Sequence, residues 1–176
     1  MLHVTKSVTI NQSPETVYRF WRDFSNLPRF MAHVLRVDLK EGDRLSHWVV
    51  AAPAGQTVEW DAEVVEDRAN SVIAWRSLDD SDIRHEGFVR FDRAPADRGT
   101  EVHVDLRYDA PAGQAGAAIA KLFGEEPSQQ IGDDLRRFKQ VMETGEVVRS
   151  DGSLEGAGQG PWKQRAAQAP DAEVER

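Results

Sequence analysis

Hydrophobic and polar residues alternate along much of the chain before Tyr108, which is typical of strands that bury one face. The clearest alternation runs from Thr57 to Val64, where every even-numbered position is apolar and every odd-numbered position is polar. Similar patterns predict further strands at residues 2–10, 35–40, 45–51, 72–78, 83–91 and 101–108. The segments between the later strands are too short for helical crossovers, so the pattern favours an antiparallel meander.

The alternation also predicts which side chains each strand buries. In residues 35–40 it places Leu35, Val37 and Leu39 on the inner face. In residues 45–52 it leaves two alternatives, because both faces are largely apolar. Leu45, His47, Val49 and Ala51 form one face, and Ser46, Trp48, Val50 and Ala52 form the other.

Two short helices follow the first strand. Ser13 provides an N-cap, Pro14 the first helical position and Glu15 an acid in the first turn, so a helix begins there and ends near Asp23. A second short helix begins near residues 25–28 and turns Leu27, Phe30 and Met31 inward. The side chains that the first helix buries at helical spacing are Val17, Phe20, Trp21 and Phe24.

A long amphipathic helix ends the folded part of the chain. Ile131, Leu135, Phe138 and Met142 recur at helical spacing, with charged residues between them. A helical piece at residues 115–123 precedes it, and the long helix restarts near Pro127 and ends at Gly145. We expect one domain over residues 1–146 and a disordered tail over residues 147–176, which are rich in Gly, Pro and Gln.

This order of elements predicts an α+β fold in which a curved antiparallel sheet of about seven strands wraps around the long C-terminal helix. Large side chains on the inner face then either fill the concave side or line a pocket of ~300–1,000 Å³. The pattern leaves both alternatives open for Trp60, Trp75, Phe91 and Tyr108.

Two polar residues are candidates for chemistry on the inner face. His85 shares a strand face with Ile83, Val89 and Phe91, where it would orient a ligand oxygen or transfer a proton, or else lie half in water beside an acidic loop. Arg76 shares a face with Val72 and Ala74, although Ile73 and Trp75 compete for the inside of the same strand.

Several common chemistries lack their sequence signatures. The five histidines are scattered, no Gly-rich phosphate loop joins a strand to a helix, and no G-x-S-x-G elbow occurs. Glu59, Asp61 and Glu63 align on one strand face, which we interpret as the solvated side. We therefore expect no metal and no cofactor.

Composition limits the partners and the location. A net charge of −8 argues against nucleic acid as the main partner, and the absence of cysteine excludes disulfides and thiolate catalysis. The first residues do not resemble a signal peptide, and no apolar run approaches the ~20 residues of a membrane span. We expect a cytoplasmic protein, and leave open transient membrane contact and the oligomeric state.

Six segments together resemble one known superfamily. They are residues 14–18 (PETVY), 23–30 (DFSNLPRF), 58–60 (VEW), 73–77 (IAWRS), 87–91 (GFVRF) and 99–102 (GTEV). In order and spacing the chain resembles the START-like, polyketide cyclase/dehydrase (SRPBCC) superfamily, near the branch that includes coenzyme-Q-binding START proteins. The resemblance implies a helix-grip fold with a hydrophobic cavity between the sheet and the long helix.

Three functions are compatible with such a cavity. The first, which we favour, is binding, transport or sensing of a small hydrophobic ligand such as a quinone, a lipid or a polyketide-like aromatic. The second is a polyketide cyclase or dehydratase, with His85, Arg76 and Tyr108 as weak catalytic candidates. The third is a non-catalytic interaction protein with a filled core. The predicted ligand-binding residues are Phe30, Trp60, Trp75, His85, Val89, Phe91, Val104, Tyr108, Leu135 and Phe138.

Overall fold

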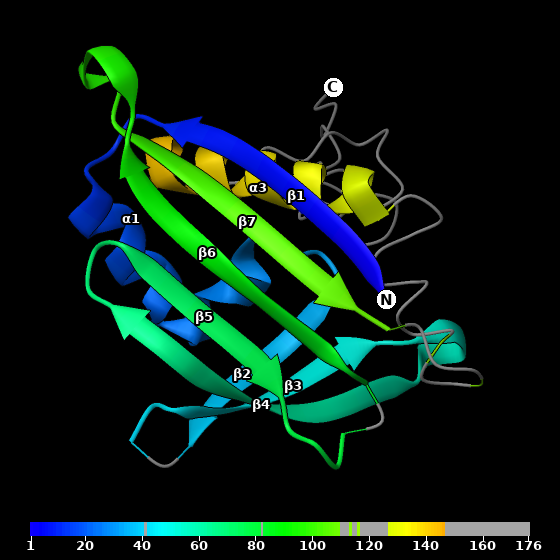
Figure 1. Ribbon diagram of the computed structural model, residues 1–176. Coiled ribbons are helices and arrows are strands. Elements are labelled where there is room, and N and C mark those ends of the chain that lie inside the picture. Colours follow the sequence, from blue (N-terminus) through cyan, green and yellow to red (C-terminus); the bar gives the residue numbers. More distant parts are fainter. Residues whose placement is uncertain (41, 82, 110–112, 114–115, 117–126, 147–176) are drawn as a thin grey trace, which may run out of the picture.

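The structure is a computed structural model that describes residues 1–40, 42–81, 83–109, 113, 116 and 127–146 (Figure 1). Its centre is one antiparallel sheet of seven strands in the order β1-β7-β6-β5-β4-β3-β2. The strands are β1 (Leu2–Ile10), β2 (Val34–Lys40), β3 (Leu45–Ala51), β4 (Thr57–Arg68), β5 (Val72–Ser77), β6 (His85–Arg93) and β7 (Thr100–Tyr108). The predicted α+β class with a curved antiparallel sheet is confirmed.

The helices cover one face of this sheet. They are α1 (Pro14–Arg22), the 3₁₀ helix η1 (Phe24–Arg29) and α3 (Pro127–Thr144). Two further single-turn 3₁₀ helices, η2 (Pro53–Gly55) and η3 (Pro95–Asp97), lie in loops. In Figure 1, α1 and α3 lie on the same side of the sheet, with α3 behind β1 and β7. The predicted helical piece at 115–123 and the predicted tail fall almost entirely outside the described residues.

Helix α3 begins and ends where the sequence predicts. Ile131, Leu135 and Phe138 are buried, Met142 is partly buried, and Val141 joins the buried stripe. Gly145 follows the helix with a φ of 79°, and its N–H donates to the Val141 carbonyl. Glycine adopts this left-handed conformation without the steric cost that other residues incur, so it ends the helix here.

The edge strand β1 is bound to α3 through its backbone. Lys139 Nζ donates to the Thr9 carbonyl at 2.6 Å, and Glu143 accepts from the Asn11 N–H at 2.8 Å. Lys139 and Glu143 are also paired with each other at 2.8 Å. These contacts satisfy backbone groups that an edge strand otherwise offers to another chain.

The prediction for the inner face of β2 was wrong at its first residue. Leu35 is 54% exposed, whereas Val34 and Val37 are buried. The register between β2 and β3 shifts between Val34 and Arg36, so a β-bulge reverses the alternation at this point. Sequence periodicity does not reveal such a bulge, because one extra residue moves every preceding side chain to the other face.

An aromatic cluster joins the helices to the sheet. The Phe30 ring lies 4.6 Å from the Phe138 ring and 5.3 Å from the Trp21 ring, and Trp21 lies 5.1 Å from Phe138. Trp21 also meets Phe91 of β6, edge to face, at 6.3 Å. Rings at these separations add to the burial of apolar area, so this cluster holds α1, α3 and the residue after η1 in one arrangement.

Gly87 of β6 lies where three strands pass closely. It pairs with Trp75 of β5 and Leu106 of β7. A Cβ at this position would lie 2.6 Å from the Asp105 carbonyl oxygen and 3.0 Å from Cζ2 of Trp75. Backbone cannot move aside cheaply, so the curvature of the sheet here requires glycine.

We predict that Gly87→Ala lowers the free energy of unfolding by about 1–3 kcal/mol, because the methyl group overpacks against backbone. The matched control is Gly132→Ala in the interior of α3, where the new Cβ meets only Lys6 Cε at 4.0 Å. Alanine is the better helix former, so this control should gain up to about 1 kcal/mol. Urea unfolding of both variants measures the difference, and equal stability of Gly87→Ala and wild type would contradict the prediction.

Candidate ligand-binding cavity

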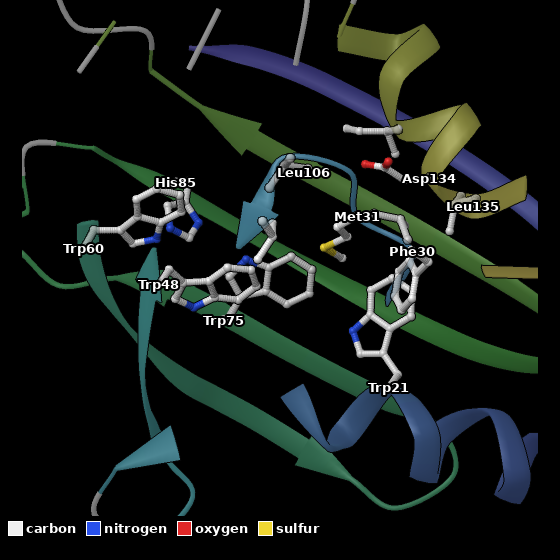
Figure 2. Close-up of a pocket in the computed structure, with 13 residues that line it drawn as sticks. Trp21, Phe30, Met31, Trp48, Trp60, Trp75, His85, Leu106, Asp134 and Leu135 are labelled. Carbon is white, nitrogen blue, oxygen red and sulfur yellow. The ribbon is translucent and has the colours of Figure 1, made fainter. Parts of the chain in front are cut away.

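A cavity of about 100 Å³ lies between the inner face of the sheet, α3 and the segment that joins η1 to β2 (Figure 2). His85 and Trp60 lie at one end of it, and Phe30, Met31 and Asp134 lie at the other. The residues that line it are Trp21, Phe30, Met31, Val34, Trp48, Trp60, Trp75, His85, Val104, Leu106, Ile131, Asp134 and Leu135. The lining is therefore apolar except at its two ends.

Two stacked indoles form part of the wall. Trp48 of β3 and Trp60 of β4 are directly paired across the strands, with ring centroids 6.1 Å apart and planes 5° from parallel. Trp48 Nε1 donates to Ser46 Oγ at 2.9 Å, and that hydroxyl donates to the Ala62 carbonyl at 3.2 Å. Strand pairing and this short chain of hydrogen bonds fix the orientation of Trp48.

Two side-chain nitrogen atoms at the His85 end of the cavity are buried without a hydrogen bond. These are Trp60 Nε1 and His85 Nε2, and neither has a partner among the described residues. The rings of Trp60 and His85 meet edge to face at 5.5 Å, so the two groups are neighbours. A buried polar group without a partner costs about 1–3 kcal/mol, which makes this the most unusual pair in the cavity wall.

The charge state of His85 follows from its burial. Removal from water disfavours the imidazolium and lowers the His85 pKa from 6.5 to about 4. The backbone N–H of His85 donates to Ser77 Oγ at 3.1 Å, which fixes the start of β6. At neutral pH the ring is uncharged, so it offers one donor and one acceptor but no ionic charge.

Asp134 forms the polar group at the opposite end. Its Oδ1 accepts from Gln130 Nε2 and Arg137 Nη2, each at 3.0 Å, and from the Ala32 N–H at 3.4 Å. Arg137 Nε donates to the Phe30 carbonyl at 3.2 Å. These contacts bind α3 to the segment after η1 and close this end of the cavity.

The structure divides the predicted ligand-binding residues into two groups. Phe30, Trp60, Trp75, His85, Val104 and Leu135 line the cavity. Val89, Phe91, Tyr108 and Phe138 are buried in the surrounding core instead. Tyr108, opposite His85 on β7, is only 1% exposed, and burial raises its pKa.

Sequence reasoning missed several lining residues. Trp48 was one of two alternatives for the inner face of β3, and the pairing with Trp60 selects it. Asp134 stood among the polar positions of α3, with no signal of its contact with the segment after η1. The other residues missed are Trp21, Met31, Val34, Leu106 and Ile131, all apolar and at positions that the pattern had assigned to the core or had not distinguished.

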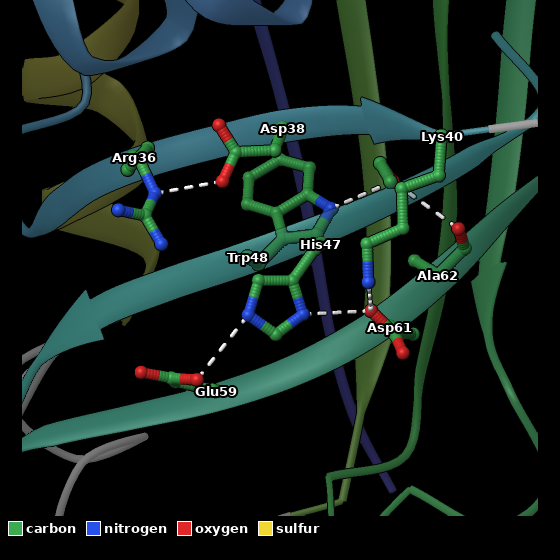
Figure 3. Close-up of polar contacts among 9 residues, drawn as sticks. Arg36, Asp38, Lys40, His47, Trp48, Glu59, Asp61 and Ala62 are labelled. Atoms are coloured by element: carbon green, nitrogen blue, oxygen red, sulfur yellow. Dashed lines mark hydrogen bonds and ion pairs between the residues drawn. The ribbon is translucent and has the colours of Figure 1, made fainter.

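Arg76 and His47 lie on the outer face of the sheet. Arg76 Nε donates to Glu63 at 2.5 Å, which raises the Arg76 pKa, and its side chain is exposed. His47 contacts Asp61 through Nδ1 at 2.8 Å and Glu59 through Nε2 at 3.2 Å (Figure 3). The three aligned carboxylates of β4 are thus paired in the outer charged layer, away from the cavity.

Within the described ranges, no group of three or more His, Asp or Glu side chains is placed to hold a metal ion. In the same ranges, no helix has the length and apolar character needed to cross a membrane.

Comparisons with known proteins agree with this fold. Residues 10–136 match the family described as polyketide cyclase / dehydrase and lipid transport. DR_A0006 from Deinococcus radiodurans is 41% identical, with a TM-score of 0.68, over 82% of this chain and 99% of that chain. TTHA0849 from Thermus thermophilus is 26% identical, with a TM-score of 0.61, over 79% of this chain and 95% of that chain.

A more distant similarity concerns the fold alone. The di-domain ARO/CYC BexL from the BE-7585A biosynthetic pathway is 19% identical, with a TM-score of 0.58, over 85% of this chain and 51% of that chain. No curated protein sequence matches the chain.

We predict that His85 makes stability fall as the pH falls below 6.5. The unfolded chain takes up a proton at this histidine near its ordinary pKa of 6.5, whereas the folded chain does so only near 4. Stability is therefore fully present above 6.5 and decreases, by up to about 3 kcal/mol, as the pH falls to 4. His85→Leu should remove this part of the pH dependence in urea unfolding.

The control is His103→Leu, which removes an imidazole that contacts Ser7 on the outer face. It should keep the wild-type decrease between pH 6.5 and 4. An equal decrease in His85→Leu and wild type would show that the His85 pKa is not lowered.

Proposed function

Because the chain belongs to the polyketide cyclase / dehydrase and lipid transport family, we propose that it binds a small hydrophobic molecule with at least one hydrogen-bonding oxygen. The ligand occupies the cavity between the sheet and α3, and the protein acts as its carrier or sensor. Quinones, lipids and polyketide-like aromatics are the classes that this proposal covers.

The observation that carries the proposal is the pair of unpartnered nitrogens, Trp60 Nε1 and His85 Nε2, beside an apolar cavity. An indole N–H is a donor only, whereas a neutral imidazole nitrogen is a donor or an acceptor depending on its tautomer. A ligand carbonyl accepts from both groups, and a ligand hydroxyl accepts from Trp60 and donates to His85. Either oxygen relieves the cost of burying the two nitrogens.

The aromatic walls support a ligand with a planar apolar part. Trp48, Trp60 and Trp75 present large, rigid surfaces, and Met31 at the other end of the cavity is a flexible apolar side chain that adapts to the ligand. Small-molecule sites commonly combine such walls with a few polar groups that set the orientation.

A cyclase is the second candidate, favoured by the family description itself. In that case neutral His85 would take a proton from the substrate during ring closure. Its low pKa makes it a weak base, and the exposed Arg76 on the outer face does not reach it. Binding without chemistry therefore accounts for more of the geometry than catalysis does.

The first test is native mass spectrometry of the protein purified from its own host, followed by organic extraction and identification of the bound molecule. We expect a hydrophobic molecule that contains oxygen, recovered unchanged after incubation with the protein. A molecule that is converted during incubation would favour the cyclase. An empty protein whose melting temperature is unaffected by quinones, lipids and phenols would contradict the proposal and favour the interaction protein with a filled core.

The second test uses His85→Leu, which puts an apolar side chain in place of the imidazole and so removes the ring nitrogens. We predict that affinity for the extracted molecule falls about 2–12-fold, the value of one neutral hydrogen bond. His103→Leu on the outer face is the control and should bind as wild type does. Fluorescence of the cavity tryptophans reports the binding, and an unchanged affinity in His85→Leu would exclude His85 as a ligand contact.

A further inference from the structure

We infer that the cavity takes a single six-membered ring that carries one hydroxyl or carbonyl oxygen, and that Trp75, lying across Gly87, is the residue that excludes fused ring systems. This inference rests on the proposed function, since it names the class of ligand for the same cavity. It is carried by the size of the cavity, by the rigidity of its wall and by the position of Trp75.

The size of the cavity limits the ligand to one ring. Its volume is about 100 Å³. An apolar cavity of about 150 Å³ accepts benzene in other proteins, and sites for larger ligands have about 300–1,000 Å³. A single ring therefore needs only small movements of the lining side chains, whereas a second fused ring needs one wall to be displaced.

The wall formed by β3 and β4 resists displacement. Trp48 and Trp60 stack on paired positions of neighbouring strands, and Ser46 holds the Trp48 indole through a hydrogen bond. Moving either ring would break the stack or leave the Trp48 N–H without its acceptor. The end of the cavity at Asp134 is also closed, because Asp134 accepts a hydrogen bond from the Ala32 N–H and Arg137 donates one to the Phe30 carbonyl.

Trp75 forms a further wall of the cavity, on the side of β5. Trp75, Gly87 and Leu106 are paired in one row across β5, β6 and β7, and both Trp75 and Leu106 line the cavity. Cζ2 of Trp75 would lie only 3.0 Å from a Cβ on residue 87, so a side chain there would press against the indole. The absence of a side chain at Gly87 thus lets the indole lie across the sheet and fill space that a second ring would need.

The position of the ligand oxygen follows from the same geometry. Trp60 Nε1 and His85 Nε2 are at one end of the cavity, and the Asp134 carboxylate at the other already accepts from three donors. The oxygen therefore points to His85 and Trp60, and the apolar edge of the ring points to Met31 and Leu135 (Figure 2).

Three probes test this arrangement in the full chain: phenol, toluene, which has nearly the same shape without the oxygen, and 1-naphthol, which adds a fused ring. We expect phenol to bind the wild type at least 2-fold more tightly than toluene, because only phenol satisfies the two nitrogens. We expect 1-naphthol to bind at least 10-fold more weakly than phenol, although its larger apolar surface alone would favour it. Quenching of tryptophan fluorescence and isothermal titration calorimetry measure both ratios.

The variant Trp75→Leu should reverse the order, so that 1-naphthol binds more tightly than phenol. Trp75→Phe is a milder change that keeps an aromatic ring, and it should give an intermediate ratio if Trp75→Leu does not fold. The control is Phe88→Leu, which shortens an aromatic residue next to Gly87 that does not line the cavity. It should keep the wild-type preference.

Comparable binding of phenol and 1-naphthol to the wild type, or an unchanged preference in both Trp75 variants, would overturn the inference and leave the proposed function standing. Failure of all three probes to bind would also overturn it. In that case the molecule extracted from the native protein decides separately whether the cavity binds ligand at all.

Discussion

The constraint on which the structure depends is that one open sheet must be covered by helices much narrower than itself. Seven strands spaced ~4.8 Å apart span roughly 29 Å, whereas an α-helix is ~10 Å across. Helix α3 covers the side near β1, and α1 and η1 cover the inner face near β6 and β2. The space between them is filled mainly by aromatic side chains, and the cavity is the part that remains.

Aromatic packing turns this space into a defined site. Phe30, Trp21 and Phe138 meet at the centre of the three helices, and the polar contacts of Asp134 and Arg137 hold the same segment to α3 from outside. Both sets of contacts act on the residues just after η1. The cavity therefore has walls on rigid strands, and both sets of contacts hold its closing segment to α3.

Trp60 Nε1 and His85 Nε2 depart from the rule that buried polar groups form hydrogen bonds. Elsewhere in the described core, polar groups such as Ser46 and Ser77 have hydrogen-bond partners, whereas these two neighbouring nitrogens have none. Natural proteins usually depart from full polar satisfaction at functional sites, where a ligand supplies the missing partner. Burial also keeps the His85 ring neutral, so at neutral pH the ring offers hydrogen bonds and no ionic charge at this end of the cavity.

The sequence by itself determined the strands, the buried stripe of α3 and about half of the cavity wall, because alternation and helical spacing report which face a side chain takes. The fold family followed from the resemblance of six short segments to a known superfamily. Tertiary structure alone decided the rest. Residues 45–52 are apolar on both faces, so only pairing with β4 turns Trp48 inward and His47 outward. A bulge exposes Leu35. Periodicity shows which face of the sheet a side chain takes, but not where it lies on that face. All four predicted aromatic residues lie on the inner face, yet only Trp60 and Trp75 line the cavity, whereas Phe91 and Tyr108 fill the core.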